Sequence, residues 1–129
     1  MASLPQLLGA FLGILEAHSL CKKVVVLETK EFSTDQYFIK IRAEIAKGYK
    51  LQIRIYYNYG HVDYAYQLFT ELPILRWDNK EEFSDLASYP HHFHAIDGYI
   101  KNSPLSGDPL KDISIVLQYL KSYINSLHA

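Results

Sequence analysis

The stretch that decides the fold is FIKIRAEIAKGYKLQIRIYY, residues 38–57. Apolar and polar side chains alternate on both sides of a break at Lys47-Gly48, which is the pattern of two strands that each bury one face. The sequence therefore predicts an antiparallel hairpin with one face in the core. The residues expected on that face are Ile39, Ile41, Ala43, Ile45, Leu51, Ile53, Ile55 and Tyr57.

The register of this hairpin follows from which residues must share the buried face. A two-residue connection at Lys47-Gly48 would place Ile45 opposite Lys50, an apolar side chain against a charged one. Shifting the pairing by one residue places Ile45 opposite Leu51. Directly opposed residues lie on the same face of a sheet, so we expect the second register, with a three-residue connection or a bulge near Gly48.

Further strands are expected on both sides of the hairpin. The β-branched run at 24–27 indicates a strand within residues 22–32, and alternation indicates another at 62–69. Residues 74–77 begin a fifth strand. Residues 92–101 form a last strand or edge segment that is broken at Asp97-Gly98. The polar segment between them is irregular, with a short helix expected around 80–87.

A helix is predicted at each end of the chain. Ser3 and Gln6 form the pattern of a capping box around Pro5, ahead of an apolar stripe at residues 4–18. Asp108-Pro109 starts a second helix with apolar residues at helical spacing. The order of helix, antiparallel meander and helix predicts an α+β fold with one twisted antiparallel sheet of about five to six strands and both helices on one face. We expect residues 1–129 to form one domain.

Composition excludes several classes of protein. The 13 Lys and Arg residues balance 14 Asp and Glu residues, so net charge predicts no strong non-specific attraction to nucleic acid. Cys21 is the single cysteine, which excludes an internal disulfide and fits a reducing cytoplasm. It is expected to be a small core residue rather than a nucleophile. The apolar start of the chain is interrupted by Glu16 and His18, so we expect neither a signal peptide nor a membrane span.

Two short segments concentrate the groups that can do chemistry: RWDN at residues 76–79 and YPHHFH at residues 89–94. If the second segment is extended, His92 and His94 project to the same face and can share a metal ion or a phosphate. A third metal ligand would have to come from elsewhere, for example Asp78 or His61. There is no second His-x-His pattern and no cysteine pair, so metal-free chemistry is the first interpretation and a divalent metal at His92 and His94 is the alternative.

The metal-free interpretation is ribonuclease-type chemistry. Histidines can act as general acid and base near neutral pH, and an arginine can hold a phosphate and stabilise the charge of the transition state. A carboxylate can orient a histidine, and a tyrosine can stack on a base. The residues expected in these roles are His91, His92, His94, Arg76 and Asp78 as catalytic groups, with Asn79, Tyr64 and Tyr66 in substrate binding.

Each of these features also has a purely structural interpretation. Arg76 and Asp78 lie two residues apart in a predicted strand, so they can form a same-face ion pair, and Trp77 between them is expected in the core. The basic residues on the polar face of the central hairpin are either a phosphate-contacting patch or a solvated face. Those residues are Lys40, Arg42, Lys50 and Arg54.

The two polar segments, together with the Tyr64-x-Tyr66 strand, resemble the TumE-like proteins. Members of that family share a Tyr-x-Tyr strand, an Arg-aromatic-Asp-Asn segment and a Pro-His-His-x-His segment, followed by a loop and a C-terminal helix. The resemblance extends from the first helix to Leu120. It implies the toxin half of a type II toxin–antitoxin pair, with a helix-turn-helix protein as the antitoxin. Transferred onto this sequence, the pattern implies the same site residues: Arg76, Asp78, Asn79, His91, His92 and His94, with Tyr64 and Tyr66 in support.

The chain departs from the family pattern at one point. Family members often carry Pro-His-His directly after the Asp-Asn pair, whereas this chain has Lys80-Glu81-Glu82. A second hypothesis is therefore a non-enzymatic binding module or an inactive family member, in which the histidines are structural or hold a metal. An open sheet leaves a strand edge at each end, which suits a homodimer or a partner interface.

Overall fold

The centre of the fold is a single antiparallel sheet of seven strands whose spatial order follows their order in the chain. The structure, a computed structural model, describes residues 2–128. Its strands are β1 (Cys21–Ser33), β2 (Gln36–Ile45), β3 (Lys50–Asn58), β4 (His61–Phe69), β5 (Pro73–Asp78), β6 (His92–His94) and β7 (Ile100–Asn102). The count exceeds the expected five to six because the Asp97-Gly98 break makes a hairpin of the last segment, with Gly98 at positive φ.

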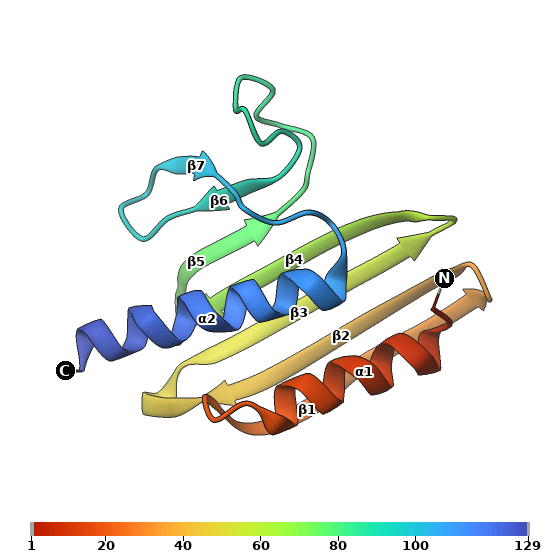
Figure 1. Ribbon diagram of the computed structural model, residues 1–129, viewed down its shortest axis with the longest axis horizontal. Coiled ribbons are helices and arrows are strands. Elements are labelled where there is room, and N and C mark those ends of the chain that lie inside the picture. Colours follow the sequence, from red (N-terminus) through yellow and green to blue (C-terminus); the bar gives the residue numbers. More distant parts are fainter. Residues whose placement is uncertain (1, 129) are drawn as a thin grey trace.

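Both helices lie on one face of this sheet, which confirms the predicted α+β class (Figure 1). Helix α1 (Leu4–Ala17) lies in front of β1 and β2, and α2 (Pro109–Leu127) lies in front of β3 and β4. Ser3 and Gln6 form the expected capping box, and Asp108 caps α2 through the backbone N–H of Leu110. Within residues 2–128, the other face of the sheet carries no helix, and we call it the open face.

The central hairpin buries the side that its alternation predicts. Every residue expected on the core face is buried: Ile39, Ile41, Ala43, Ile45, Leu51, Ile53, Ile55 and Tyr57. The predicted three-residue connection is present, because the N–H of Ile45 donates to the carbonyl of Tyr49 across a short 3-10 turn, Ala46–Gly48. Cys21 is half-buried and packs against the core, and burial raises the pKa of its thiol.

The predicted pairing of Ile45 with Leu51 is wrong by two residues. Leu51 lies opposite Ala43, and Ile45 lies opposite Tyr49. Both registers keep the same residues on the core face, so the hydrophobic pattern cannot separate them. The turn decides between them, because Lys47 and Gly48 take positive φ values of 67° and 82° and must occupy the connection.

The segment between β5 and β6 contains no helix, so the short helix expected at 80–87 is wrong. Within this segment Leu86 N–H donates to the Phe83 carbonyl and Tyr89 N–H to the Leu86 carbonyl, which are isolated turn bonds. Ser84 and Asp85 compete with helical bonding, since their short polar side chains favour turns. Among residues 2–128, no helix is both long and apolar enough to cross a membrane.

Candidate functional site

The pairing of β5 with β6 sorts neighbouring residues onto opposite faces of the sheet. Asp78 lies opposite His92 and Arg76 opposite His94, all on the open face. Trp77 lies opposite Phe93 on the face beneath the helices, where their rings stack with centroids 4.8 Å apart. The prediction that Trp77 belongs to the core is confirmed, since only 2% of it is exposed.

Asp78 is the centre of the polar group on the open face. Arg76 Nε donates to Asp78 Oδ2 at 2.8 Å, and His92 Nε2 lies 2.8 Å from Oδ1. His94 Nε2 lies 3.5 Å from Oδ2, and the backbone N–H of Lys80 donates to Oδ1. We call Arg76, Asp78, His92 and His94 the Asp78 cluster. The expected same-face ion pair of Arg76 with Asp78 is therefore part of a larger arrangement.

Burial divides the members of the cluster into fixed and reachable groups. Asp78 and His92 are buried, with 5% and 1% exposed. The other ring nitrogen of His92, Nδ1, lies 3.2 Å from the Pro90 carbonyl, and the edge of the Phe83 ring packs against His92. The side chains of His94 and Arg76 are 37% and 39% exposed. A molecule that approaches from solvent can therefore reach both at once.

The surroundings of His94 favour its neutral form. Partial burial lowers the pKa of His94, and nearby His92 and Arg76 lower it further, against the opposing effect of Asp78. A neutral imidazole near pH 7 can accept a proton. His94 is thus the half-exposed member of the cluster that is suited to proton transfer.

Asp78, His92 and His94 could also hold a metal ion. One ligand atom from each residue lies within 4.8 Å of the others. Of the two third ligands that the sequence offers, Asp78 is the one at the site. His61 lies at the start of β4 and bonds Asp63 instead, with 3.0 Å between His61 Nε2 and Asp63 Oδ1.

The other predicted site residues do not join the Asp78 cluster. His91 lies next to Tyr64, with 2.8 Å between the Tyr64 hydroxyl and His91 Nδ1. Tyr64 and Tyr66 belong to the core beneath the helices, and burial raises the pKa of both hydroxyls. Asn79 uses its carboxamide on the β4 backbone, accepting from Tyr64 N–H and donating to the Val62 carbonyl. The eight predicted residues therefore fall into two groups.

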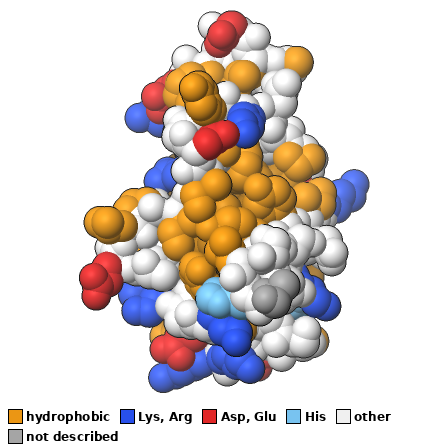
Figure 2. Space-filling view, turned by 90° about the vertical axis from the view of Figure 1, so that its left-hand side faces the viewer, with side chains coloured by type: hydrophobic (Ala, Val, Ile, Leu, Met, Phe, Trp, Pro, Cys, Tyr) orange, Lys and Arg blue, Asp and Glu red, His pale blue; other side chains and the backbone are white. Residues whose placement is uncertain are grey.

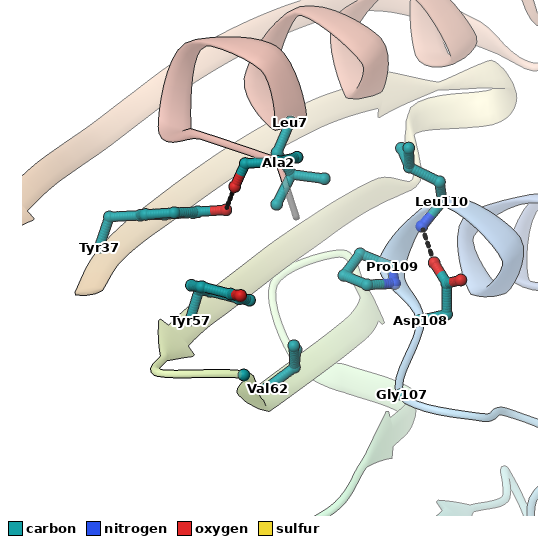
Figure 3. A pocket seen from close by; sticks show the side chains of 10 residues that line it. Ala2, Leu7, Tyr37, Tyr57, Val62, Gly107, Asp108, Pro109 and Leu110 are labelled. Carbon is teal, nitrogen blue, oxygen red and sulfur yellow. Dashed lines mark hydrogen bonds between the residues drawn. The ribbon is translucent and has the colours of Figure 1, made fainter. Parts of the chain in front are cut away.

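A cavity of about 460 Å³ opens between the N-terminal ends of the two helices (Figure 3). Tyr37, Tyr57, Leu7 and Pro109 are among its lining residues, and the Tyr37 hydroxyl donates to the Ala2 carbonyl. None of the eight predicted site residues lines it. The four residues of the Asp78 cluster lie on the open face, away from this cavity.

The sequence interpretation did not mark Phe83, whose ring packs against His92. It did include Pro90, whose carbonyl lies 3.2 Å from His92 Nδ1, in the YPHHFH segment. Phe38 and Tyr56 are different, because they occupy polar-face positions of the central hairpin, opposite each other in β2 and β3. The alternation predicts polar residues at these two positions, so the aromatic residues there are a feature by which the sequence could have marked them.

Comparison with known families gives one result for the whole chain. A family model described as Toxin TumE matches residues 11–124, which include the Asp78 cluster and all seven strands. No curated protein and no solved structure matched the chain. Because the family model spans most of the sequence, this chain belongs to the TumE toxin family.

Proposed function

We propose that this toxin acts on RNA at the Asp78 cluster, through a ribonuclease-type reaction. The observation that carries the proposal is one buried carboxylate that holds two reachable groups, a guanidinium at 2.8 Å and an imidazole at 3.5 Å. A guanidinium suits a phosphate, and an imidazole suits proton transfer. Together they can promote cleavage of a phosphodiester without a metal.

The proposed step is an attack by the ribose 2′-hydroxyl on the neighbouring phosphorus. His94 takes the proton from the hydroxyl, and the oxygen forms a bond to phosphorus. The bond from phosphorus to the 5′-oxygen then breaks, and that oxygen takes a proton from water. Arg76 binds the phosphate and stabilises the negative charge that develops on it. Asp78 orients Arg76 and His94 and keeps both on the open face.

The remaining predicted residues support this step in different ways. His92 is a positioning residue, because it is buried and bonds Asp78 at 2.8 Å. Asn79 and Tyr64 hold the end of β5 against β4. The proposed step does not use proton transfer by His91 or base stacking by Tyr64 and Tyr66, and Tyr64 and His91 variants test the first two of these roles.

Growth and RNA integrity test the proposal. Wild-type protein, His94→Gln and Arg76→Ala are induced in a bacterial host, with His61→Gln as the matched control for an exposed histidine outside the cluster. We expect growth arrest with RNA breakdown for wild type and His61→Gln, and neither effect for the two cluster variants. Thermal melting shows whether each variant is folded. Toxicity that persists in both folded cluster variants would contradict the proposal.

The same experiment addresses the departure from the family pattern. Glu81 and Glu82 stand where family members often have histidines, and the Glu82 carboxylate lies 3.3 Å from Lys80 Nζ. We propose that the histidine pair missing after Asn79 is not required. A folded wild-type protein that leaves growth and RNA unchanged would instead support an inactive family member.

A second candidate function is binding of a divalent metal by Asp78, His92 and His94. The observation in its favour is the contact of His92 Nδ1 with the Pro90 carbonyl at 3.2 Å, with Nε2 facing Asp78. Metal-binding histidines usually donate their second ring N–H to an oxygen of this kind. Two histidines and one carboxylate suit zinc or iron(II).

Titration calorimetry with zinc chloride tests the metal candidate. We expect stoichiometric binding to the wild type and to His61→Gln, and loss of binding in His92→Gln. RNA cleavage that survives a chelator would assign the reaction to the metal-free step. Cleavage that the chelator stops and zinc restores would assign it to the metal.

The family also suggests an antitoxin partner. We propose a helix-turn-helix antitoxin and a cytoplasmic complex. Figure 2 looks onto the end of the molecule where α2 ends and shows hydrophobic side chains gathered there. Exposed hydrophobic residues on α2 and on the β6–β7 connection include Ile96, Tyr99, Ile115 and Tyr119. Such patches mark protein interfaces, and we propose that the antitoxin covers this one.

Co-purification with the antitoxin tests this interface. We expect Tyr99→Asp to weaken the complex but not the fold of the free protein, because Tyr99 is 71% exposed. Tyr59→Asp is the matched control, since Tyr59 is 67% exposed on the β3–β4 turn. Light scattering on the purified toxin tests the alternative that the same patch, or the edge of β1, makes a homodimer. A monomer that binds the antitoxin equally well with either substitution would contradict both.

A further inference from the structure

Residues from five strands, β2 to β6, form a continuous row across the open face. Lys40 lies opposite Arg54, Arg54 opposite Ala65, Ala65 opposite Asp78 and Asp78 opposite His92. The row therefore connects the basic polar face of the central hairpin to the Asp78 cluster. Arg54 and Arg76, a member of that cluster, line the same pocket.

Ala65 creates a dip in this row. It lies between a long side chain on β3 and the Asp78 cluster on β5, and its methyl group leaves the space above the sheet unfilled. A pocket of about 170 Å³ lies here, and Phe38, Arg54, Tyr56, Asp63, Ala65 and Arg76 are among the residues that line it. Pockets for drug-sized ligands measure roughly 300–1,000 Å³, so this one suits a single flat ring.

The chemistry of the lining suits a nucleobase. The Arg54 guanidinium lies over the Phe38 ring, 5.7 Å from its centroid, and Tyr56 lies opposite Phe38 in the neighbouring strand. The Tyr56 hydroxyl accepts a hydrogen bond from Gln36 Nε2 at 2.7 Å, which holds its ring in place. Unpaired bases stack on aromatic rings and on arginine planes of this kind.

The charges around the pocket suit a phosphate backbone. Arg54 and Arg76 both line the pocket, and Lys40 and Arg42 occupy the open face on β2. One carboxylate, Asp63, also lines it, and its Oδ1 lies 3.0 Å from His61 Nε2. Two arginines at one small pocket, one of them belonging to the Asp78 cluster, can hold consecutive phosphates.

We propose that this pocket is a nucleotide subsite for single-stranded RNA, next to the phosphate held by Arg76. One unpaired base stacks among Phe38, Tyr56 and Arg54, and the strand continues across the open face toward β2. A duplex does not fit, because its bases are stacked on each other and cannot enter the pocket. This inference rests on the proposed function for the choice of RNA, and on the pocket for the unpaired nucleotide.

Fluorescence anisotropy tests the subsite without any cleavage. The probe is a fluorescein-labelled ten-nucleotide RNA in which every ribose is 2′-O-methylated, so that no 2′-hydroxyl can attack. Tyr56→Ser removes a stacking surface, Arg54→Gln removes a charge, and Ala65→Leu fills the pocket. The matched controls are Tyr119→Ser and Lys121→Gln, which change exposed residues of α2 on the other side of the sheet.

We expect each of the three pocket variants to bind the probe roughly tenfold more weakly than wild type. The two controls should bind like wild type, and the corresponding duplex should compete poorly. Arg54→Gln should also reduce the slope of log affinity against log salt by roughly 1. Thermal melting checks that each variant folds. If Ala65→Leu does not fold, Tyr56→Ser and Arg54→Gln still decide the question.

The outcomes separate the subsite from the proposed function. Pocket variants that bind the probe like wild type, while wild type still cleaves RNA, overturn the subsite and leave the ribonuclease proposal standing. Pocket-dependent binding without cleavage of unmodified RNA supports the subsite and contradicts the proposed ribonuclease reaction. Absence of binding by the wild type, or equal pocket-dependent binding of a poly-glutamate peptide, overturns the subsite in favour of no ligand or an acidic protein partner.

Discussion

The two faces of the β5–β6 pair differ in polarity. On one face Trp77 and Phe93 stack beneath α2, where the edge of the Tyr119 ring meets both. On the other face, one residue away in each strand, Asp78 Oδ1 lies 2.8 Å from His92 Nε2. The same six residues of backbone pairing therefore anchor the core and align the candidate site.

Under the proposed function, residues for stability and residues for function alternate along β5. A strand alternates its side chains between faces, so Trp77 faces the core and Arg76 and Asp78 face the open side. Substitutions of Arg76, Trp77 and Asp78 should then differ in how much they lower the stability of the protein and how much they reduce its toxicity. The predictions below test this separation, beginning with the largest expected change in the free energy of unfolding.

Trp77→Ala should have the largest effect. It removes a ring that is 2% exposed and stacked on Phe93, and such truncations cost about 3–5 kcal/mol. Urea denaturation of the purified protein measures the loss. Tyr99→Ala, which truncates an aromatic residue that is 71% exposed, is the matched control and should change the free energy of unfolding by less than about 0.5 kcal/mol. Similar values for the two variants would contradict the placement of Trp77 in the core.

Asp78→Ala should come second and should affect both properties. It leaves the buried His92 ring and the Lys80 N–H without their acceptor, and breaking a buried pair in this way costs about 3 kcal/mol. It should also abolish toxicity, because Arg76 and His94 lose the group that orients them.

The control for Asp78→Ala is Asp63→Ala. Asp63 is paired with His61 at 3.0 Å, but both side chains are more than half exposed. Exposed pairs contribute about 0–1 kcal/mol, so this variant should melt close to wild type. Toxicity of an Asp78→Ala protein shown to be folded would contradict the central role of Asp78.

How much of this could be predicted from the sequence depends on the range of the interactions. Alternation from Phe38 to Tyr57 predicts which side chains are buried, because the face on which a side chain lies depends only on its position along the strand. Capping predicts the helix starts at Ser3 and Asp108 for the same reason. The pairing of Ile45 was missed by two residues, since it depends on the positive φ of Lys47 and Gly48.

The sequence names the members of the Asp78 cluster, but it does not show that the eight predicted residues fall into two groups. Extended spacing places His92 and His94 on one face, as expected. The sequence does not say that His91 faces the other way and meets Tyr64, because that depends on the chain turning at Pro90 into β6. Nor does it place Ala65 beside Asp78, since this contact needs the register of β4 with β5.

Tyr64→Phe should have a smaller effect, on the side of the sheet beneath the helices. It removes the hydroxyl that lies 2.8 Å from His91 Nδ1, which should cost about 1 kcal/mol. Toxicity should persist, because neither residue touches the Asp78 cluster. The melting temperature and the growth assay together measure this outcome, and His91→Gln should behave in the same way. A stable but harmless Tyr64→Phe protein would extend the active site to His91, as the sequence first suggested.

Arg76→Gln should have the smallest effect on stability and a complete effect on function. Its side chain is 39% exposed, so the ion pair with Asp78 is screened by solvent and should contribute less than about 1 kcal/mol. Loss of a group that stabilises transition-state charge typically slows a reaction about 100- to 1,000-fold, which is enough to restore growth. Lys101→Gln is the matched control, because its exposed pair with Asp97 spans 2.9 Å on β7 and away from the cluster. Equal melting temperatures with opposite growth phenotypes for these two variants would show that the open face of β5 carries function and not stability. If Arg76→Gln instead melts several degrees lower and remains toxic, the guanidinium is a structural partner of Asp78. Both faces of β5 would then contribute to stability, although one is polar and the other apolar.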